Sequence, residues 1–364
     1  MTPVGDVAAL FDGLPDPAML LDPRGRVALV NRPARDRFGA WIDGQSYVSV
    51  LRQPVLVAPV EEAFASGASA SARFRHAAGE VETVFEVRIT ALRAGDAGTR
   101  PPVLLYFRDV TDAALGAAQR QDFVANVSHE LKTPLTSLIG FVQTLQGPAR
   151  NDAAARSRFL DLMAQDLARM DRLVSDLLSL SRVEGEARRP LRDVVDLARL
   201  TAEALDPLRA TARAVGVEIE TVLPPGAPAL AERDQIIQLV LNLAENAVKY
   251  GRRPGIVRVT LERRDREPVL RGPAWSLSVR DEGDGIAAEH LPRLTERFYR
   301  VDPGRGEAQG GTGLGLAIVK HIVNRHRGRL RIESTPGLGT IVTVVLPAPP
   351  ADDEGRTSGE RPLS

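Results

Sequence analysis

The stretch FVANVSHELKTPLTSLIGF, residues 123–141, decides how the rest of this chain is organised. Its apolar residues recur at steps of three and four, which places them on one face of a helix. That face carries Phe123, Val127, Leu131, Leu135, Leu138 and Val142. His129 stands about 200° round the helix from Val127, so its imidazole should point away from the apolar face.

Three neighbours distinguish His129 from an ordinary surface histidine. Glu130 places a carboxylate beside the imidazole, and Thr133 places a hydroxyl one turn further on, on the histidine's own face. Pro134 cannot donate a hydrogen bond to the carbonyl of Glu130, so the helix should bend just beyond the histidine. We therefore take His129, Glu130 and Thr133 as candidate catalytic residues.

The run HELKTPL, residues 129–135, resembles the phosphoacceptor box of sensor histidine kinases. Among these kinases, it is most similar to the subfamily that includes the phosphate-regulon sensors. The resemblance implies that His129 is phosphorylated from ATP and that Glu130 accepts the imidazole proton. It also implies that the phosphoryl group passes to the receiver domain of a response regulator. Thr133 matches the position that orients a water for a second, phosphatase activity.

Bulk composition limits the other possibilities. The 364 residues suffice for two or three domains, and 47 basic against 47 acidic side chains give no net attraction to nucleic acid. Cysteine is absent, which excludes disulfides and thiolate metal sites and suits a reducing compartment. No apolar run approaches the ~18 residues that span a bilayer, and the start does not resemble a signal peptide. We expect a cytoplasmic location, with any link to a membrane made through a partner.

Residues 5–112 form the first predicted domain, a small α+β unit. The predicted elements are strand, turn and strand over 14–31, a helix at 32–38, and strands at 70–76, 81–92 and 103–107. The segments LPDP, DPRGR and DVTD, with Asn31, resemble those of PAS sensor domains; a structural spacer of similar size is the alternative. His76 is a conceivable ligand, but a lone histidine in a strand is more often packed or solvated.

Residues 113–185 are predicted to form a dimerising helical hairpin. A helix should run from residue 113 through the phosphoacceptor stretch, break at the glycine and proline within 146–152, and resume over 153–184. The second helix has an a/d heptad seam made of Met163, Leu167, Met170, Val174 and Leu177. Because a lone hairpin cannot bury both apolar faces, we expect a homodimer that forms a four-helix bundle. Packing of the hairpin on the chain's own other domains is the alternative.

Residues 191–347 are predicted to form an α/β sandwich that follows a mobile linker at 185–190. The predicted elements include helices at 193–214 and 234–250 and strands at 217–222, 329–333 and 340–346. The tail, residues 348–364, is rich in proline, serine and acidic residues and poor in apolar ones. We therefore expect the tail to be disordered. The fold class is thus multidomain α+β.

The helix predicted at 234–250 carries the first candidate nucleotide ligands. Its buried side is expected to hold Leu239, Val240, Leu243 and Ala247. Asn242, Asn246, Lys249 and Tyr250 share the other side. A carboxamide oxygen suits a Mg²⁺ ion that already carries phosphate charge, so Asn246 and Asn242 are candidate metal ligands. Lys249 offers a positive charge to phosphate, and Tyr250 can cover an aromatic base.

Two glycine-containing stretches add to this candidate site. In DEGDG, a strand delivers Asp281, whose carboxylate can accept the amino hydrogen of adenine, and Gly283 and Gly285 let the backbone approach a flat ligand. In GGTGLGLAIVK, a glycine loop runs into a helix whose first N–H groups can cradle phosphate oxygens. The candidates in this loop are Gly311, Thr312, Gly313, Leu314, Gly315 and Leu316.

These stretches resemble the N, G1, F and G2 boxes of the histidine-kinase ATPase domain, which belongs to the GHKL (Bergerat) superfamily with gyrase, Hsp90 and mismatch-repair ATPases. The F box here is ERFYRVD, residues 296–302. The resemblance implies that the chain binds ATP and Mg²⁺, that Arg300 contacts phosphates, and that residues 285–311 form a lid.

One departure bears on the reaction. Hydrolases of the superfamily carry a glutamate four residues before the metal-holding asparagine, where this chain has Asn242, which is no base. Glu245, the nearest acid, lies about 100° off that face. We therefore expect slow hydrolysis and transfer to a protein nucleophile. The alternatives are a GHKL-superfamily ATPase, an inactive scaffold and a phosphatase-dominant signalling protein.

Overall fold

The computed structural model describes residues 3–78, 81–92, 100–186, 189–301 and 311–349. These residues fall into two compact units, Met1–Ala125 and Asn126–Ser364, each of which has its own fold. The tail beyond residue 349, the centre of the predicted linker and most of the segment between the F and G2 boxes lie outside the described residues. The expectations for those segments therefore stay predictions.

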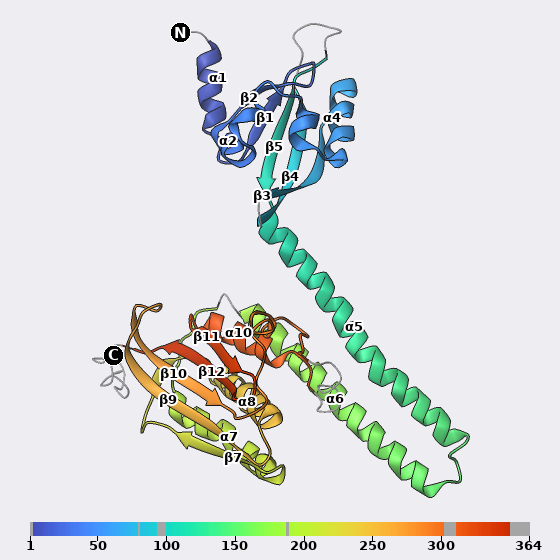
Figure 1. The fold of residues 1–364 in the computed structure, drawn as a ribbon, viewed down its shortest axis with the longest axis vertical. Helices are drawn as coiled ribbons and strands as arrows, with labels where there is room; N and C mark the ends of the chain where they lie inside the picture. Colours follow the sequence, from blue (N-terminus) through green and yellow to red (C-terminus); the bar gives the residue numbers. More distant parts are fainter. Residues whose placement is uncertain (1–2, 79–80, 93–99, 187–188, 302–310, 350–364) are drawn as a thin grey trace, which may run out of the picture. The chain divides into compact units, whose positions relative to one another are not determined.

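The first unit is built on an antiparallel five-stranded sheet in the order β2-β1-β5-β4-β3 (Figure 1). The strands are β1 Ala18–Leu21, β2 Val27–Val30, β3 Ala70–Ala78, β4 Val81–Ala91 and β5 Val103–Asp109. The helices are α1 Pro3–Asp12, α2 Arg32–Phe38, η1 Ala40–Ile42, α3 Tyr47–Leu51 and α4 Pro54–Ser66. The five predicted strands and the helix at 32–38 are confirmed, whereas α1, α3 and α4 were missed.

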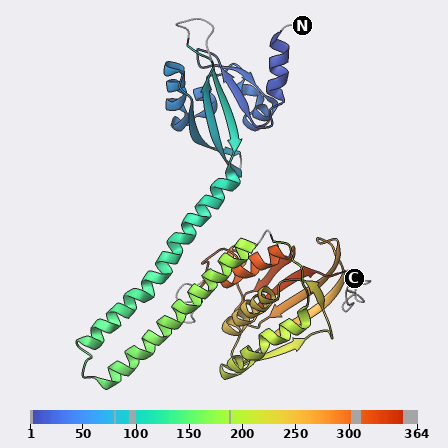
Figure 2. The same ribbon diagram turned by 180° about the vertical axis from the view of Figure 1, so that it is seen from behind.

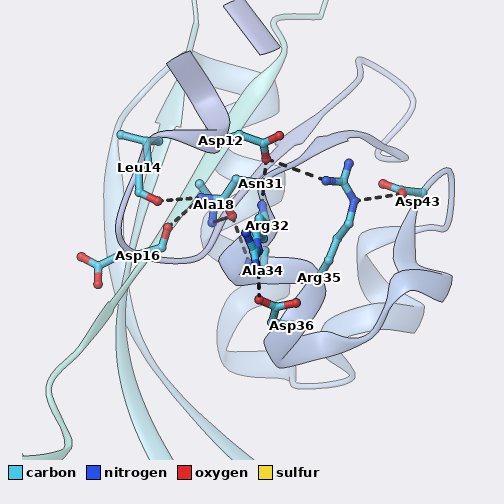
Figure 3. A network of polar contacts seen from close by, with 10 residues as sticks. All are labelled: Asp12, Leu14, Asp16, Ala18, Asn31, Arg32, Ala34, Arg35, Asp36 and Asp43. Atoms are coloured by element: carbon cyan, nitrogen blue, oxygen red, sulfur yellow. Dashed lines mark hydrogen bonds and ion pairs between the residues drawn. The ribbon is translucent and has the colours of Figure 1, made fainter. Parts of the chain in front are cut away.

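Asn31 connects the first strand to the start of α2 (Figure 3). Its side chain is fully buried, and its carboxamide oxygen accepts hydrogen bonds from the N–H groups of Ala18 (2.9 Å) and Ala34 (3.0 Å). The carboxamide nitrogen donates to the carbonyl of Asp16 at 2.8 Å. Asn31 therefore caps α2 and ties it to the segment before β1, which explains why the helix begins at the next residue.

Aromatic rings fill the core of this unit. They include Phe38, Phe64, Phe74, Phe85 and Phe107, all buried. His76 packs its ring against Phe38 with 5.0 Å between centroids, and burial lowers the pKa of its imidazole. The reading of His76 as a packed residue is confirmed, and within the described ranges no cluster of His, Asp and Glu is suited to a metal ion.

The hairpin consists of α5 Thr111–Gln146 and α6 Ala153–Glu186. α5 is one helix from the end of β5 through Pro134, which confirms the predicted helical joint, and the break at residues 147–152 is also confirmed. Asp152 caps α6 because its carboxylate accepts hydrogen bonds from the N–H groups of Ala154 and Ala155, both at 3.0 Å. α6 runs through Glu186, slightly beyond the predicted end.

Much of the apolar surface of the hairpin is exposed in the single chain. Between residues 126 and 186, seven large apolar side chains are between 39% and 57% exposed: Leu135, Ile139, Val142, Leu160, Leu167, Val174 and Leu178. The C-terminal part of α6 differs because it packs against α10, and there Leu180 and Val183 are buried. A patch of this kind is characteristic of a surface that a partner covers.

The α/β part of the second unit is a five-stranded sheet in the order β11-β12-β10-β9-β7, with α7, α8 and α10 on one face (Figures 1 and 2). The strands are β7 Val217–Val222, β9 Gly255–Glu267, β10 Gly272–Arg280, β11 Arg329–Thr335 and β12 Gly339–Pro347. The helices are α7 Leu197–Ala214, α8 Arg233–Tyr250, η2 Leu291–Arg293 and α10 Gly315–Arg325. β7 and β9 are parallel and the other pairs antiparallel.

The predicted start of the first helix in this part was wrong. Residues 194–196 form strand β6 Val194–Asp196, which pairs with β8 Pro228–Leu230, and the helix starts at Leu197. The reason is the side chain of Asp196, which accepts hydrogen bonds from the N–H groups of Ala198 (2.9 Å) and Arg199 (3.3 Å). Asp196 thus caps the helix from outside it.

Across the described part of the chain, no helix combines the length and the apolar character that a membrane crossing requires.

Candidate functional site

Helix α8 presents its two asparagines to the start of α10. Its predicted buried side is confirmed, since Leu239, Val240, Leu243 and Ala247 are at most 4% exposed. A Cβ atom at Gly315 would lie 3.0 Å from Oδ1 of Asn242 and 3.8 Å from Nδ2 of Asn246. Glycine is required here because a side chain would enter the space between the loop and both carboxamides. The fold therefore brings together Gly315 and the two asparagines, which the sequence analysis assigned to one candidate site without predicting their contact.

The glycine loop also lies beside the end of α8. Gly311 is next to Nζ of Lys249 and the hydroxyl of Tyr250, and that Nζ lies 4.7 Å from the centroid of the Tyr250 ring. Leu314, at the N-cap position of α10, is buried and no side chain caps the helix. The N-terminus of α10 thus keeps N–H groups for a ligand, with the ammonium group of Lys249 near it.

Asp281 follows β10 directly and is only 8% exposed. Its Oδ1 accepts hydrogen bonds from the N–H groups of Gly283 (2.8 Å) and Thr340 (3.3 Å). Burial raises the pKa of this carboxyl group, and the two N–H donors oppose the rise. With Oδ1 held by backbone, Oδ2 is the oxygen that can accept a hydrogen bond from a ligand amino group.

The turn after Asp281 is held on both sides. Gly283 lies against the carbonyl of Tyr250 at the end of α8, and Gly285 lies against the carbonyl of Thr335. These contacts place the predicted base-reading turn between the asparagine helix and the β11–β12 turn.

Gly313 contacts the F box through Phe298, a partner that sequence reasoning missed. The carbonyl of Gly313 accepts a hydrogen bond from the N–H of Phe298 at 2.9 Å. Gly313 has φ +72°, and a Cβ atom there would lie 2.9 Å from Cα of Phe298. Phe298 itself has φ +65°, an unusual conformation for a non-glycine residue. No local sequence signal indicates this contact, which joins two loops.

Buried polar atoms of helix α8 and of the F box have no hydrogen-bond partner among the described residues. They include Nδ2 of Asn242 and Nε and Nη2 of Arg300. Buried polar groups are normally paired, and a buried guanidinium needs an anion. These orphaned atoms, together with the carboxamide oxygens of Asn242 and Asn246, fit a phosphate ligand with Mg²⁺.

Helix α6 occupies part of this region, which the sequence did not indicate. The hydroxyl of Thr312 donates to Oδ2 of Asp176 at 2.6 Å. Burial raises the pKa of Asp176, and the hydrogen bond from Thr312 opposes the rise. Further along α6, Glu184 pairs with Arg297 of the F box. Thr312 is thus at the site but is held by the hairpin.

Glu245, on α8, lies near Asp176 and Arg172 of the hairpin. Its pKa is raised by burial first and by the nearby carboxylate of Asp176 second, while Arg172 lowers it. Both neighbours belong to α6, so Glu245 faces the hairpin.

His129 lies on the exposed face of α5, and its imidazole makes no hydrogen bond with any residue that the structure describes. The hydroxyl of Thr133 donates to the carbonyl of His129 at 3.2 Å, one turn away. The carboxylate of Glu130 makes its ion pair with Arg169 of α6, through Oε2 at 2.8 Å. The structure therefore confirms that His129 is accessible but pairs Glu130 with a residue that the sequence analysis did not consider.

An exposed histidine on a helical hairpin, followed by an α/β domain in which a glycine loop lies against two asparagines and a lysine, is the combination expected of a phosphotransfer protein. The family models agree with this class. Residues 231–350 match the model described as "Histidine kinase-, DNA gyrase B-, and HSP90-like ATPase", and residues 119–186 match the "His Kinase A (phospho-acceptor) domain". The chain belongs to the sensor histidine kinases.

Curated relatives support this assignment. The chain is 36% identical over 245 residues to the sensor-like histidine kinase SenX3 of Mycobacterium tuberculosis. The aligned region covers 67% of this chain and 58% of SenX3. The chain is 38% identical over 240 residues to the phosphate regulon sensor protein PhoR of Pseudomonas aeruginosa, covering 66% and 53%. The chain thus spans somewhat more than half the length of these relatives.

A solved structure shares the fold. The histidine kinase ThkA, in complex with the response regulator protein TrrA, superposes with a TM-score of 0.50 at 20% identity, covering 94% of this chain and 98% of that one. The identity is too low to carry more than the architecture.

Proposed function

We propose that this chain is an ATP-dependent protein histidine kinase that phosphorylates its own His129 and passes the phosphoryl group to an aspartate of a response-regulator receiver domain. The observation that carries the proposal is the exposed imidazole of His129 in a chain that also has buried Asn242 and Arg300 atoms with no hydrogen-bond partner among the described residues. A nucleophile and a phosphate-binding pocket are the two parts that phosphoryl transfer requires.

The chain's own residues supply binding and orientation. Asp281 accepts a hydrogen bond from the adenine amino group, and Lys249 and Arg300 neutralise phosphate charge next to the N-terminus of α10. Asn246 and Asn242 would hold Mg²⁺, which adds neutralising charge when bound. Their carboxamides are not bases, so water in the pocket is poorly activated and His129 is the preferred acceptor.

Proton removal accompanies attack by His129. One ring nitrogen bonds to the γ-phosphorus while the bond to ADP breaks, and the proton on the other ring nitrogen passes to a base. Glu130 is the carboxylate adjacent in the chain. Thr133 lies one turn from His129 and is placed to orient a water for dephosphorylation of the partner aspartate.

We also propose that the chain acts as a homodimer. The exposed apolar side chains of α5 and α6 support this, because pairing two hairpins into a four-helix bundle would remove them from water. The first unit is proposed to be a PAS-like sensor on the evidence of its sequence motifs and mixed sheet-and-helix fold. The chain is proposed to work in the cytoplasm and to reach nucleic acid only through its response regulator.

The test is incubation of the full chain with γ-labelled ATP and Mg²⁺, followed by acid and alkali. We expect a label that is lost in acid, survives alkali and stops near one phosphate per chain. The variant His129→Gln should bind ATP normally and carry no label. Continuous phosphate release without a labelled protein would instead identify an ATPase of the same superfamily.

A further inference from the structure

An ion pair crosses the helical hairpin one residue beyond His129. Nη2 of Arg169 on α6 lies 2.8 Å from Oε2 of Glu130 on α5. The two side chains are only 15% and 28% exposed, so the pair is better shielded from water than an ordinary surface ion pair. A contact this short between two ionised groups is a charge-assisted hydrogen bond, which fixes geometry as well as adding energy.

This contact determines where the carboxylate of Glu130 lies. Successive residues leave a helix about 100° apart, so Glu130 faces α6 while His129 faces solvent. A glutamate side chain that is free in solvent samples several rotamers, and ordering it costs conformational entropy. Arg169 removes that freedom in advance, and it takes Oε2, which leaves Oε1 as the oxygen for an imidazole N–H.

We propose that Arg169 is a positioning residue for the phosphorylation of His129. The proposal rests on the kinase activity proposed above. As one imidazole nitrogen bonds to the γ-phosphorus and ADP leaves, the proton on the other nitrogen passes to Oε1 of Glu130, whose Oε2 stays bound to Arg169. The guanidinium keeps its charge throughout and also offsets the negative charge that the new phosphoryl group brings next to Glu130.

Arg169→Gln in the full chain tests the proposal, with Arg169→Lys as the conservative variant. Arg158→Gln is the matched control, because Arg158 is an exposed arginine on the same helix. Initial labelling rates at varied ATP concentration give kcat and KM. We expect Arg169→Gln to lower kcat by about tenfold or more, because the carboxylate is no longer pre-positioned, with an unchanged KM for ATP. Arg169→Lys should recover a large part of the rate, and Arg158→Gln should match the parent.

A double-mutant cycle separates positioning from a purely structural role. In a Glu130→Ala background, Arg169→Gln should cause no further loss, because the group that it positions is absent. A further loss in that background would overturn the proposal, as would an equal kcat for Arg169→Gln and the parent. Rates are compared at a temperature where circular dichroism shows equal helix content. An unlabelled parent chain would overturn the kinase proposal as well, whereas a labelled parent with an equally fast variant would overturn only this one.

Discussion

The substitution Gly313→Ala tests whether the glycine loop and the F box form one ligand-binding surface. Gly313 has φ +72°, and an added Cβ atom would lie 2.9 Å from both Cα and the carbonyl carbon of Phe298. These are backbone atoms, so they cannot move aside as the end of a flexible side chain would. The loop must therefore shift, and the hydrogen bond from the N–H of Phe298 to the carbonyl of Gly313 is lost.

The expected cost follows from these two effects. Placing alanine in the left-handed region costs about 1 kcal/mol, and losing the hydrogen bond costs about 1 kcal/mol more. A total of about 2 kcal/mol lowers the equilibrium constant for the binding-competent loop about 30-fold, and lowers the fraction of chains with that loop by up to the same factor. Because apparent affinity falls in proportion to that fraction, the Kd for ATP should rise by about the same factor.

The assay is a titration of the full chain with ATP and Mg²⁺ by calorimetry. Gly216→Ala is the control, since Gly216 has φ +81° but a Cβ atom there meets nothing within 4 Å. The control should lose about 1 kcal/mol of unfolding free energy through backbone strain and keep the parent affinity. A Kd for Gly313→Ala within about threefold of the parent value would refute the reasoning, because the strain and clash would then not reach the ligand.

Three further predictions concern other parts of the second unit. Burial holds the pKa of the Asp281 carboxyl group in the folded chain above its unfolded value. The stabilising contribution of this carboxyl group is therefore present below the unfolded pKa and is lost as pH rises through the folded pKa. Asp281→Asn should raise the melting temperature at neutral pH but not in acid, and it should weaken ATP binding. Equal melting temperatures at pH 7 would contradict this. Asp176→Ala removes the acceptor of the Thr312 hydroxyl and should speed initial labelling about fivefold by releasing a contact worth about 1 kcal/mol; a slower rate would show that the contact assists the reaction. Leu135→Glu combined with Leu167→Glu should shift the chain to monomer in sedimentation velocity, because both side chains are half-exposed on the faces proposed to pair; an unchanged sedimentation coefficient would place the partner surface elsewhere.

The sequence by itself determined the parts that depend on local periodicity and short motifs. The helix with His129 on its exposed face and the buried side of α8 follow from the 3.6-residue repeat, and the break before α6 follows from its glycine and proline. The ends of helices were less well determined. The helix predicted from residue 193 begins at Leu197, because Asp196 is its cap while the preceding residues pair with β8. Pairing with a distant strand overrode a pattern that alone was compatible with helix.

The tertiary structure decided which distant residues meet. Gly315 lies against Asn242, Gly313 bonds to Phe298, Thr312 donates to Asp176, and Arg169 holds Glu130. Each contact joins residues on different elements, and no residue's own neighbours in the sequence specify such a pairing. Local spacing fixes which face of a helix a side chain occupies, whereas only the packing of one element on another fixes what that face touches.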